Sequence, residues 1–448
     1  MTWSYLPHTT EDRAEMLATI GVKDSMELFA DVPEAIRLPR ALNLPGPLSE
    51  AELAAHFQKL GAANANLQDY ACFLGAGAYD HFIPSTVDHV LRRSEFYTAY
   101  TQYQPEIAQG YLQALWEYQS MICELTGMPV ANASMYDGAT AMAEAAILAC
   151  SATRRREIVV ARTVHPHYRQ VLATYARDFD YEIKEIDFTA GVTALTTLTE
   201  LVSKATATVI IQNPNFFGSL EDLAALGQAT HSVGALFTVV HNPIALGILE
   251  APGKLGADLV VGEGQPLGLA LSFGGPYLGF MAASTKLMRK LPGRIVGQTV
   301  DRDGKRGFVL TLQAREQHIR RDKATSNICS NEALCALAAA VYLAAMGKTG
   351  FAATAEHCLQ KAHYAYEAIL EHGTGQAVFT APFFNEFVVK LSSPVATVNE
   401  KLLAQKLIGG LDLGQYYPEL DGCVLLCVTE KRTQAEIDRL VLGLGGLA

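Results

Sequence analysis

The stretch Ala257-Asp258-Leu259-Val260-Val261-Gly262-Glu263-Gly264-Gln265-Pro266-Leu267-Gly268 decides the fold of this chain. Its apolar first half is typical of a buried strand, and the glycines that follow indicate a tight turn. Gln265 stands three residues before Gly268. The nearest lysines are Lys254, which precedes the strand, and Lys286, which lies beyond the next expected strand. The stretch therefore predicts a strand that ends in a glycine-rich turn without a lysine.

Outward from this stretch, short β-branched runs alternate with helical segments. We expect strands at 157–161, 208–212, 236–240, 258–261 and 278–282, and helices between them at 139–150, 168–177 and 220–230. Apolar strands separated by helices favour a mostly parallel sheet that is covered on both faces. In such sheets, ligands lie at the carboxyl ends of the strands. The expected fold class is therefore α/β.

The chain divides into three expected parts. Residues 1–70 form a helical N-terminal extension, in which Ser49 and Glu52 have the spacing of a capping box. Residues 71–330 form the large α/β domain. Residues 331–448 form a linking helix and a small C-terminal α+β domain. Its expected elements are an alanine-rich helix at 333–345 that glycines at 347 and 350 interrupt, strands near 386–390 and 424–428, and a final helix at 434–444.

The composition indicates a globular protein and excludes several kinds of partner. Half of the 448 residues are hydrophobic and 18% are charged. The net charge of -11 argues against binding to nucleic acid or to an anionic membrane. The N-terminus lacks the pattern of a signal peptide, and the eight cysteines lack the spacing of metal ligands. We therefore expect a cytoplasmic protein without a metal site.

The layout around Gln265 resembles the lysine site of the fold type I pyridoxal-phosphate (PLP) transferases, the aspartate-aminotransferase-like fold. In that fold the Schiff-base lysine stands three residues before a glycine, where this chain has Gln265. The amide nitrogen of glutamine is not nucleophilic and cannot replace that lysine. The resemblance thus implies a PLP fold in which the covalent anchor is missing.

The other groups of a PLP site give a mixed result. The strand at 236–240 should end in an acid for the pyridine nitrogen, but His241 and Asn242 follow it. Asp137, before the helix that should hold the phosphate, either opposes that anion or caps the helix. His165 either stacks on the cofactor ring or is a capping or core residue. Two groups are missing and two remain open.

Three longer motifs closely resemble the P-protein family of the glycine cleavage system, more narrowly its separate N-terminal (α) subunit. They are TQYQPEIAQG at 101–110, GEGQPLG at 262–268 and REQHIRRDKATSNIC at 315–329. The resemblance runs from residues 5–7 to the tail motif VTEKR at 428–432. In one departure, Asn242 stands where the family usually carries aspartate.

The resemblance implies a two-subunit enzyme. A homologous β subunit would carry the lysine and PLP, and this chain would bind no cofactor covalently. Together the two subunits would decarboxylate glycine and pass its aminomethyl group to the lipoyl arm of the H-protein. This chain would then be inactive in isolation and would act as one subunit of glycine decarboxylase.

The resemblance also implies groups that this chain offers to its partner. Related enzymes donate a threonine to the neighbouring subunit's cofactor from a loop like that at 323–327. We therefore expect Thr325, with Ser326 or Asn327, to reach the PLP phosphate of the β subunit. The alternative is that these residues cap the next helix.

A second loop contains polar aromatics and amides around a proline, the composition of a positioning loop. We expect Tyr100, Tyr103 and Gln104 to line the entrance for glycine and the lipoyl arm. Interface packing without substrate contact is the alternative.

A third cluster contains His318, Arg320 and Arg321, and binds either a carboxylate or acids of the partner.

Two other functions remain open from the residues alone. The chain could be an autonomous PLP enzyme that uses an unexpected lysine. It could also be a purely structural or regulatory subunit, whose interface loops contribute nothing to turnover.

Overall fold

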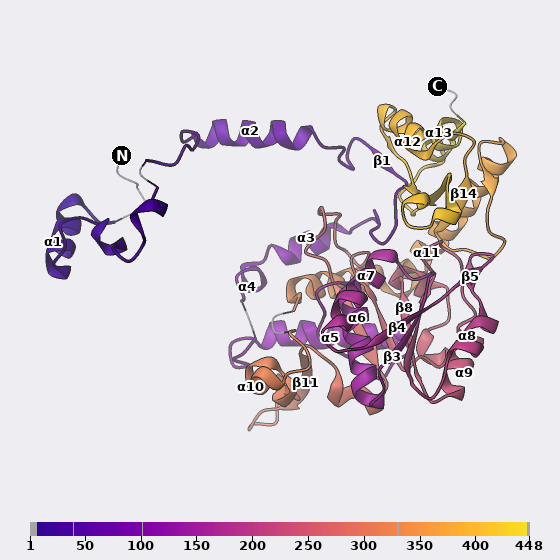
Figure 1. Ribbon diagram of the computed structural model, residues 1–448, viewed down its shortest axis with the longest axis horizontal. Helices are drawn as coiled ribbons and strands as arrows, with labels where there is room; N and C mark the ends of the chain where they lie inside the picture. The colour runs from indigo at the N-terminus through magenta and orange to yellow at the C-terminus, as the bar shows by residue number, and fades with distance from the viewer. Residues whose placement is uncertain (1–6, 39, 101, 329–330, 446–448) are drawn as a thin grey trace. The chain divides into compact units, whose positions relative to one another are not determined.

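The computed structural model describes residues 7–38, 40–100, 102–328 and 331–445. Thr101 and Cys329, at the ends of two of the motifs above, lie outside the described residues. The chain forms two compact units, Met1–Asn64 and Ala65–Ala448, which we describe separately (Figure 1).

The N-terminal unit contains the helices α1 (Thr10–Ile20) and α2 (Glu50–Ala62). Each begins with a capping box, and the predicted box of Ser49 and Glu52 is confirmed. The extension is helical only in part: between α1 and α2 the described residues form only the 3₁₀ turns Glu27–Phe29 and Glu34–Ile36. Prolines at 33, 45 and 47 account for this, because proline and the residue before it disfavour a helix interior.

A seven-stranded sheet forms the centre of the second unit (Figure 1). Its spatial order is β2 (Val130–Ala131), β10 (Gly279–Ala283), β9 (Leu259–Glu263), β8 (Leu236–His241), β7 (Thr206–Asn213), β3 (Glu157–Ala161) and β4 (Glu182–Ile186). The strands from β9 to β4 are parallel, and β10 runs antiparallel to both of its neighbours, β9 and β2, so that β2 again has the direction of the parallel strands. The predicted α/β class with a mostly parallel sheet is confirmed.

Helices cover both faces of this sheet. From β3 the chain steps outward to β4 through α7 (Pro166–Arg177), and it then returns past β3 to β7 through α8 (Leu195–Leu201). Because parallel crossovers are right-handed, these opposite steps place the two helices on opposite faces. The helix α6 (Gly138–Thr153) packs against α7 and the sheet, whereas α9 (Leu223–Ser232) packs against α8.

The remaining elements of this region lie around the sheet. They are α3 (Ser85–Leu91), α4 (Ser94–Tyr97), α5 (Gln109–Thr126), the hairpins β5 (Phe188–Thr189) with β6 (Val192–Thr193) and β11 (Ile295–Val300) with β12 (Arg306–Thr311), and the short helix α10 (Gln317–Arg320). The sequence analysis did not predict the β11–β12 hairpin, which lies directly before the third family motif.

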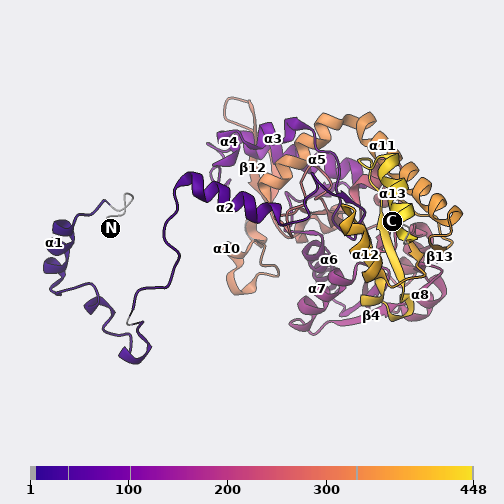
Figure 2. The ribbon, with the colours of Figure 1, turned by 90° about the horizontal axis from the view of Figure 1, so that it is seen from above.

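The C-terminal region has its own sheet and core, seen in yellow in Figure 1 and from above in Figure 2. The sheet order is β13 (Gln376–Ala377), β14 (Glu386–Lys390), β17 (Cys423–Cys427) and β16 (Leu411–Asp412), and the helices are α12 (Val395–Ala404) and α13 (Gln434–Leu444). In addition, β1 (Ala71–Cys72) pairs with β15 (Leu407–Ile408). This pairing fixes the start of the segment that enters the candidate site.

One long helical element, α11 (Ala333–Glu371), joins the two sheets. The predicted break occurs at Gly347, whose φ of 60° interrupts the helix, but the helix passes through Gly350 without interruption. Glycine adopts this positive φ without the steric cost of a Cβ. By length and composition, α11 is the one described helix able to cross a membrane, and half of its qualifying window is buried inside the fold, as in a core helix.

Candidate functional site

The candidate site lies at the carboxyl edge of the parallel strands. Here β8 ends at His241 and β9 ends at Glu263, two residues before Gln265. The segment of residues 73–82, which follows β1, crosses this edge and contacts Gln265, Glu386 and His165. Since ligands of α/β sheets bind at this edge, the segment occupies the place where a cofactor would be expected.

The amide of Gln265 is fully buried and holds the backbone of Tyr79. Its Oε1 accepts a hydrogen bond from the Tyr79 N–H at 2.9 Å. Its Nε2 donates to the carbonyls of Tyr79 at 2.9 Å and Leu269 at 2.7 Å. Both amide protons are therefore used. At the position of the Schiff-base lysine, the chain has a group that fixes its own backbone.

Glu386, on β14, holds the same segment from the other side. Its carboxylate accepts from the Ala76 N–H at 2.7 Å and from the Tyr79 hydroxyl at 2.8 Å. Burial raises the pKa of Glu386 to about 7, although both hydrogen bonds lower it. Glu386 and Tyr79 carry no signal in the sequence, because nothing in their local pattern shows that they meet.

His165 is covered by this segment and by aromatic rings. Its Nδ1 accepts from the His167 N–H at 3.1 Å, so its Nε2 donates to the Ala76 carbonyl at 3.0 Å. The ring stacks on Tyr168 with a centroid distance of 4.8 Å. Burial lowers the pKa of His165 to about 4, so the ring is neutral. The structure favours the capping alternative over cofactor stacking.

Close approach of the backbone requires a glycine beside His165. Gly77 has a φ of +101°, and a Cβ built there would lie 2.9 Å from His165 Nε2. A larger residue would force the segment off the site, since both the conformation and the space need glycine.

The tail motif fixes the next turn of the same segment. Asp80 forms ion pairs with Lys431 at 2.6 Å and with Arg432 at 3.0 Å. His81 Nδ1 lies 2.7 Å from a carboxylate oxygen of Glu430. These contacts give the motif at 428–432 a structural role.

Two carboxylates occupy the N-terminus of α6, where a phosphate would bind. Asp137 Oδ1 accepts from the Thr140 N–H at 2.8 Å, which confirms its alternative role as the helix N-cap. Glu263 accepts from the Gly138 N–H at 3.0 Å. Burial raises the pKa of Glu263 to about 7. A phosphate dianion does not fit here, because its donors are taken and an acid lies beside it.

The acid that would pair with the pyridine nitrogen of PLP is also absent among the described residues at the end of β8. Asn242 caps the 3₁₀ turn Pro243–Gly247 by accepting from the Ile244 N–H at 3.0 Å. His241 is buried, which lowers its pKa to about 4 and keeps the ring neutral. Among the described residues of this edge, the set therefore does not fit covalently bound PLP.

The two nearest lysines in sequence lie at the opposite edge of the sheet. Lys254 precedes the start of β9. Lys286 follows the end of β10, which runs antiparallel to β9. Lys254 is exposed and pairs with Glu250 at 2.9 Å. Neither lysine can reach the position of Gln265 without rearrangement of the sheet.

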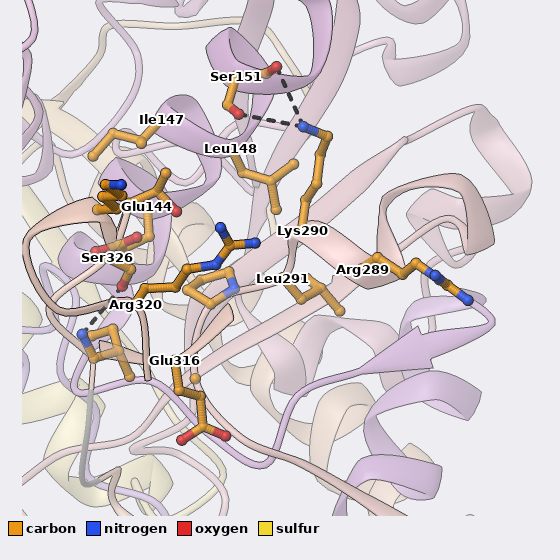
Figure 3. Close-up of a pocket in the computed structure, with 15 residues that line it drawn as sticks. Glu144, Ile147, Leu148, Ser151, Arg289, Lys290, Leu291, Glu316, Arg320 and Ser326 are labelled. Carbon is orange, nitrogen blue, oxygen red and sulfur yellow. Dashed lines mark hydrogen bonds between the residues drawn. The ribbon is translucent and has the colours of Figure 1, made fainter. Parts of the chain in front are cut away.

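Thr325 and Ser326 line a cavity of about 240 Å³ between α6 and the segment around α10 (Figure 3). Glu144, Lys290 and Arg320 also line it. An adjoining pocket contains Thr325, Ser326 and Asn327 together. Lys290 and Arg320 on the wall of the first cavity make this region suitable for an anion. Burial raises the pKa of Glu144 to about 7, which reduces the negative charge on the same wall.

The alternative that these residues cap the next helix is wrong. The helix α11 begins at Ala333 with Glu332 as its N-cap, and no side chain caps it. Instead, Ser326 Oγ accepts from the Ile328 N–H at 3.2 Å within its own loop.

The structure brings Tyr103 and His318 of two separate motifs together. Their rings lie 6.3 Å apart, and Tyr103 stacks on the guanidinium of Arg294 at 4.9 Å. Tyr100 is 88% exposed, and Gln104 is exposed as well. The loop therefore presents its predicted side chains on the surface, where a partner can contact them.

One group of side chains has the composition of a metal site. His81, Cys358 and Glu430 place one ligand atom each within 4.8 Å of one another. The same atoms already form hydrogen bonds, since Cys358 Sγ donates to Glu430 at 3.4 Å and His81 lies at 2.7 Å. The contacts are those of a hydrogen-bonded triad, and the expected absence of a metal stays a prediction.

The sheet order and the site at its carboxyl edge define the class of protein, a fold type I PLP-transferase scaffold. The solved structure of sphingosine-1-phosphate lyase from Burkholderia pseudomallei has this fold. It is 14% identical, with a TM-score of 0.66, and the match covers 93% of this chain and 94% of that chain. At this identity the likeness shows the fold alone.

Closer relatives show the family. A sequence model of the glycine cleavage system P-protein matches residues 3–444. The probable glycine dehydrogenase (decarboxylating) subunit 1 of Desulforamulus reducens is 56% identical over 99% of this chain and all of that protein. A solved glycine decarboxylase (P-protein), in inhibitor-bound form, has a TM-score of 0.90 and 42% identity, with all of both chains covered. The chain belongs to the glycine cleavage system P-protein family, as its motifs predict.

Replacement of Gln265 tests its structural role. Gln265→Ala should lower the free energy of unfolding by about 2–4 kcal/mol, because it leaves buried groups of Tyr79 and Leu269 without partners. Urea unfolding followed by tryptophan fluorescence measures this. Gln170→Ala, at an exposed position on α7, is the matched control. Equal midpoints for the two variants would contradict the assigned role.

The buried Glu386 predicts a pH dependence. Its pKa rises from 4.5 to about 7 on folding, so between these values the folded chain keeps a proton that the unfolded chain has lost. Stability therefore falls as pH rises through this range. Glu386→Gln should reduce this loss of unfolding free energy by up to about 3 kcal/mol, because glutamine does not titrate. The difference in unfolding free energy between variant and wild type should grow from pH 4.5 to 7. A difference in unfolding free energy that stays constant over this pH range would contradict the raised pKa of Glu386.

Proposed function

We propose that this chain is the cofactor-free subunit of a cytoplasmic glycine decarboxylase whose homologous β subunit carries PLP. The observation that carries the proposal is the amide of Gln265, which stands at the lysine position and is bound to Tyr79. A family that decarboxylates glycine with PLP needs the lysine elsewhere, and a homologous partner supplies it. Glycine would lose carbon dioxide in that partner's site, and the aminomethyl group would pass to the lipoyl arm of the H-protein.

The N-terminal unit supports the existence of a protein partner. None of its described residues is buried by the rest of the unit itself. Its large exposed side chains include Met16, Ile20, Met26, Leu28, Phe29, Ile36, Leu38, Leu42, Leu44, Leu48, Leu53, Phe57 and Leu60. So much exposed apolar surface is typical of a segment that is buried on another chain. The relatives named subunit 1 also imply a second subunit.

Two loops of this chain would complete the partner's site. Thr325, with Ser326 or Asn327, would donate hydrogen bonds to the PLP phosphate of the β subunit, in a region that already presents Arg320. Their hydroxyl and amide groups suit an anion, and PLP itself would supply the electron sink for decarboxylation.

At the entrance, Tyr100, Tyr103 and Gln104 would position glycine and the lipoyl arm. Their role would be orientation and exclusion of water rather than covalent chemistry. The exposure of this loop and its contact with the motif that contains His318 support the proposal.

Reconstitution tests the proposed function. The chain and its β partner, each purified and then mixed with H-protein and PLP, should exchange labelled carbon dioxide with the glycine carboxyl group. Each subunit alone should give less than about 1% of that rate, because this chain lacks the lysine and the partner lacks the donated loops. Exchange by this chain alone would support the autonomous enzyme instead.

The phosphate contact predicts a cofactor effect. Thr325→Ala should weaken PLP binding to the assembled enzyme by about tenfold or more, the value of one hydrogen bond to a charged group. Thr325→Ser should restore binding, and Thr196→Ala, exposed at the far α8, is the matched control. Equilibrium dialysis measures the affinity. An unchanged dissociation constant in Thr325→Ala would contradict the contact.

The entrance loop predicts a kinetic effect. The double variant Tyr103→Phe, Gln104→Ala should lower kcat/KM for the H-protein-dependent reaction by about 10- to 100-fold, because two polar contacts are lost. Tyr97→Phe, on the exposed end of α4, is the control. Normal turnover with normal assembly would favour the purely structural subunit.

A further inference from the structure

Arg294 is the largest fully buried side chain among the described residues. It precedes β11, and its backbone carbonyl accepts from the Ala133 N–H at 2.8 Å. Its guanidinium is covered by the ring of Tyr103 at 4.9 Å. Tyr103 itself is 52% exposed, so Arg294 lies one side chain beneath the surface. The position places a permanent cation under the predicted entrance loop.

The charge of Arg294 is not paired within the described part of the chain. Its Nη1 donates to Gln102 Oε1 at 3.4 Å, while Nε and Nη2 are buried without a hydrogen-bond partner. Among the described residues, no carboxylate oxygen lies within 4.0 Å of this guanidinium. A buried, unpaired guanidinium is strongly unfavourable, so a ligand that satisfies it is expected.

The two unpartnered nitrogens define the chemistry of that ligand. Nε and Nη2 lie on one edge of the guanidinium, the edge that binds both oxygens of a carboxylate in parallel. Two further buried acceptors among the described residues have no hydrogen-bond partner: Asn132 Oδ1, on a side chain whose amide donates to the Pro292 carbonyl, and Glu316 Oε1, on a carboxylate that lies beside His318.

We propose that the Nε–Nη2 edge of Arg294 binds a carboxylate in the assembled enzyme. The inference rests on the proposed function, because the ligand reaches this edge once the entrance loop meets the partner. The carboxylate is that of glycine or that of an acidic side chain of the β subunit. Both sources present the same two oxygens to the same edge, and the test separates them.

The test uses Arg294→Lys in the reconstituted enzyme, since lysine keeps the charge but loses the two-pronged edge. For a glycine carboxylate, the dissociation constant of glycine should rise about 10- to 100-fold while that of methylamine, which has no carboxylate, stays unchanged. PLP absorbance reports both titrations. For a carboxylate of the partner, both constants should stay unchanged and subunit association should weaken about tenfold or more. Either result supports the proposal.

Arg302→Lys, in the exposed turn between β11 and β12, is the matched control. If Arg294→Lys equals this control in glycine affinity, methylamine affinity and association, the proposal is overturned. Equal losses of glycine and methylamine affinity would overturn it too, because the effect would then be independent of the carboxylate.

A second variant tests the proposal independently, in case Arg294→Lys does not fold. Gln102→Glu places a carboxylate beside Nη1 without removing the arginine. It should therefore stabilise the isolated chain and weaken binding of the proposed carboxylate ligand. Gln102→Glu with wild-type thermal stability and ligand binding would count against the proposal. Activity of the wild-type pair reports separately on the proposed function, so failure of one is not mistaken for failure of the other.

Discussion

The hydrogen bonds between the Gln265 amide and the backbone of Tyr79 are the constraint on which the rest of the site depends. They fix the segment of residues 73–82 across the carboxyl edge of the sheet. His165 and Glu386 then hold the same segment through Ala76. A lysine at position 265 would break this arrangement, because the ammonium group of lysine cannot accept a hydrogen bond from the Tyr79 N–H. In the proposed cofactor-free subunit, the absence of the cofactor anchor and the closure of the edge would thus have the same structural cause.

The same logic applies at the N-terminus of α6. In a PLP site, this helix end would offer free N–H groups to a phosphate. Here Glu263 and Asp137 take the N–H groups of Gly138 and Thr140. An internal carboxylate and a bound phosphate would compete for the same backbone N–H groups. The chain has kept the scaffold of a PLP enzyme, and its own side chains satisfy the polar groups that a cofactor would otherwise use.

The fold could be predicted from the sequence because its signal is local. Strands such as β3 and β14 each contain three consecutive apolar residues, IVV and FVV, and the capping box at Ser49 is a short pattern that forms without tertiary contacts. The missing lysine and acid could be read at Gln265 and Asn242 for the same reason. Asp137 left two alternatives, and only its contact with Thr140 in the folded chain separates them.

The rest of the site could not be predicted because it depends on contacts between distant segments. Glu386 lies more than 300 residues from Ala76, and no local pattern indicates that they meet. The unpaired state of Arg294 is likewise a property of packing. Capping of the next helix, the alternative for Thr325, does not occur because that helix begins only at Ala333, with Glu332 as its N-cap. The residues that we propose to serve a partner, such as Tyr100, differ from the rest of the site by their exposure, which no local pattern of the sequence indicates.

Borohydride reduction of the assembled enzyme with bound PLP, followed by mass spectrometry of peptides from both subunits, tests the central claim most directly. Reduction makes the Schiff base permanent, so the pyridoxyl group marks the lysine that held the cofactor. We expect the mark on a single lysine of the β subunit and none on any lysine of this chain. A pyridoxyl-lysine in this chain would contradict the account.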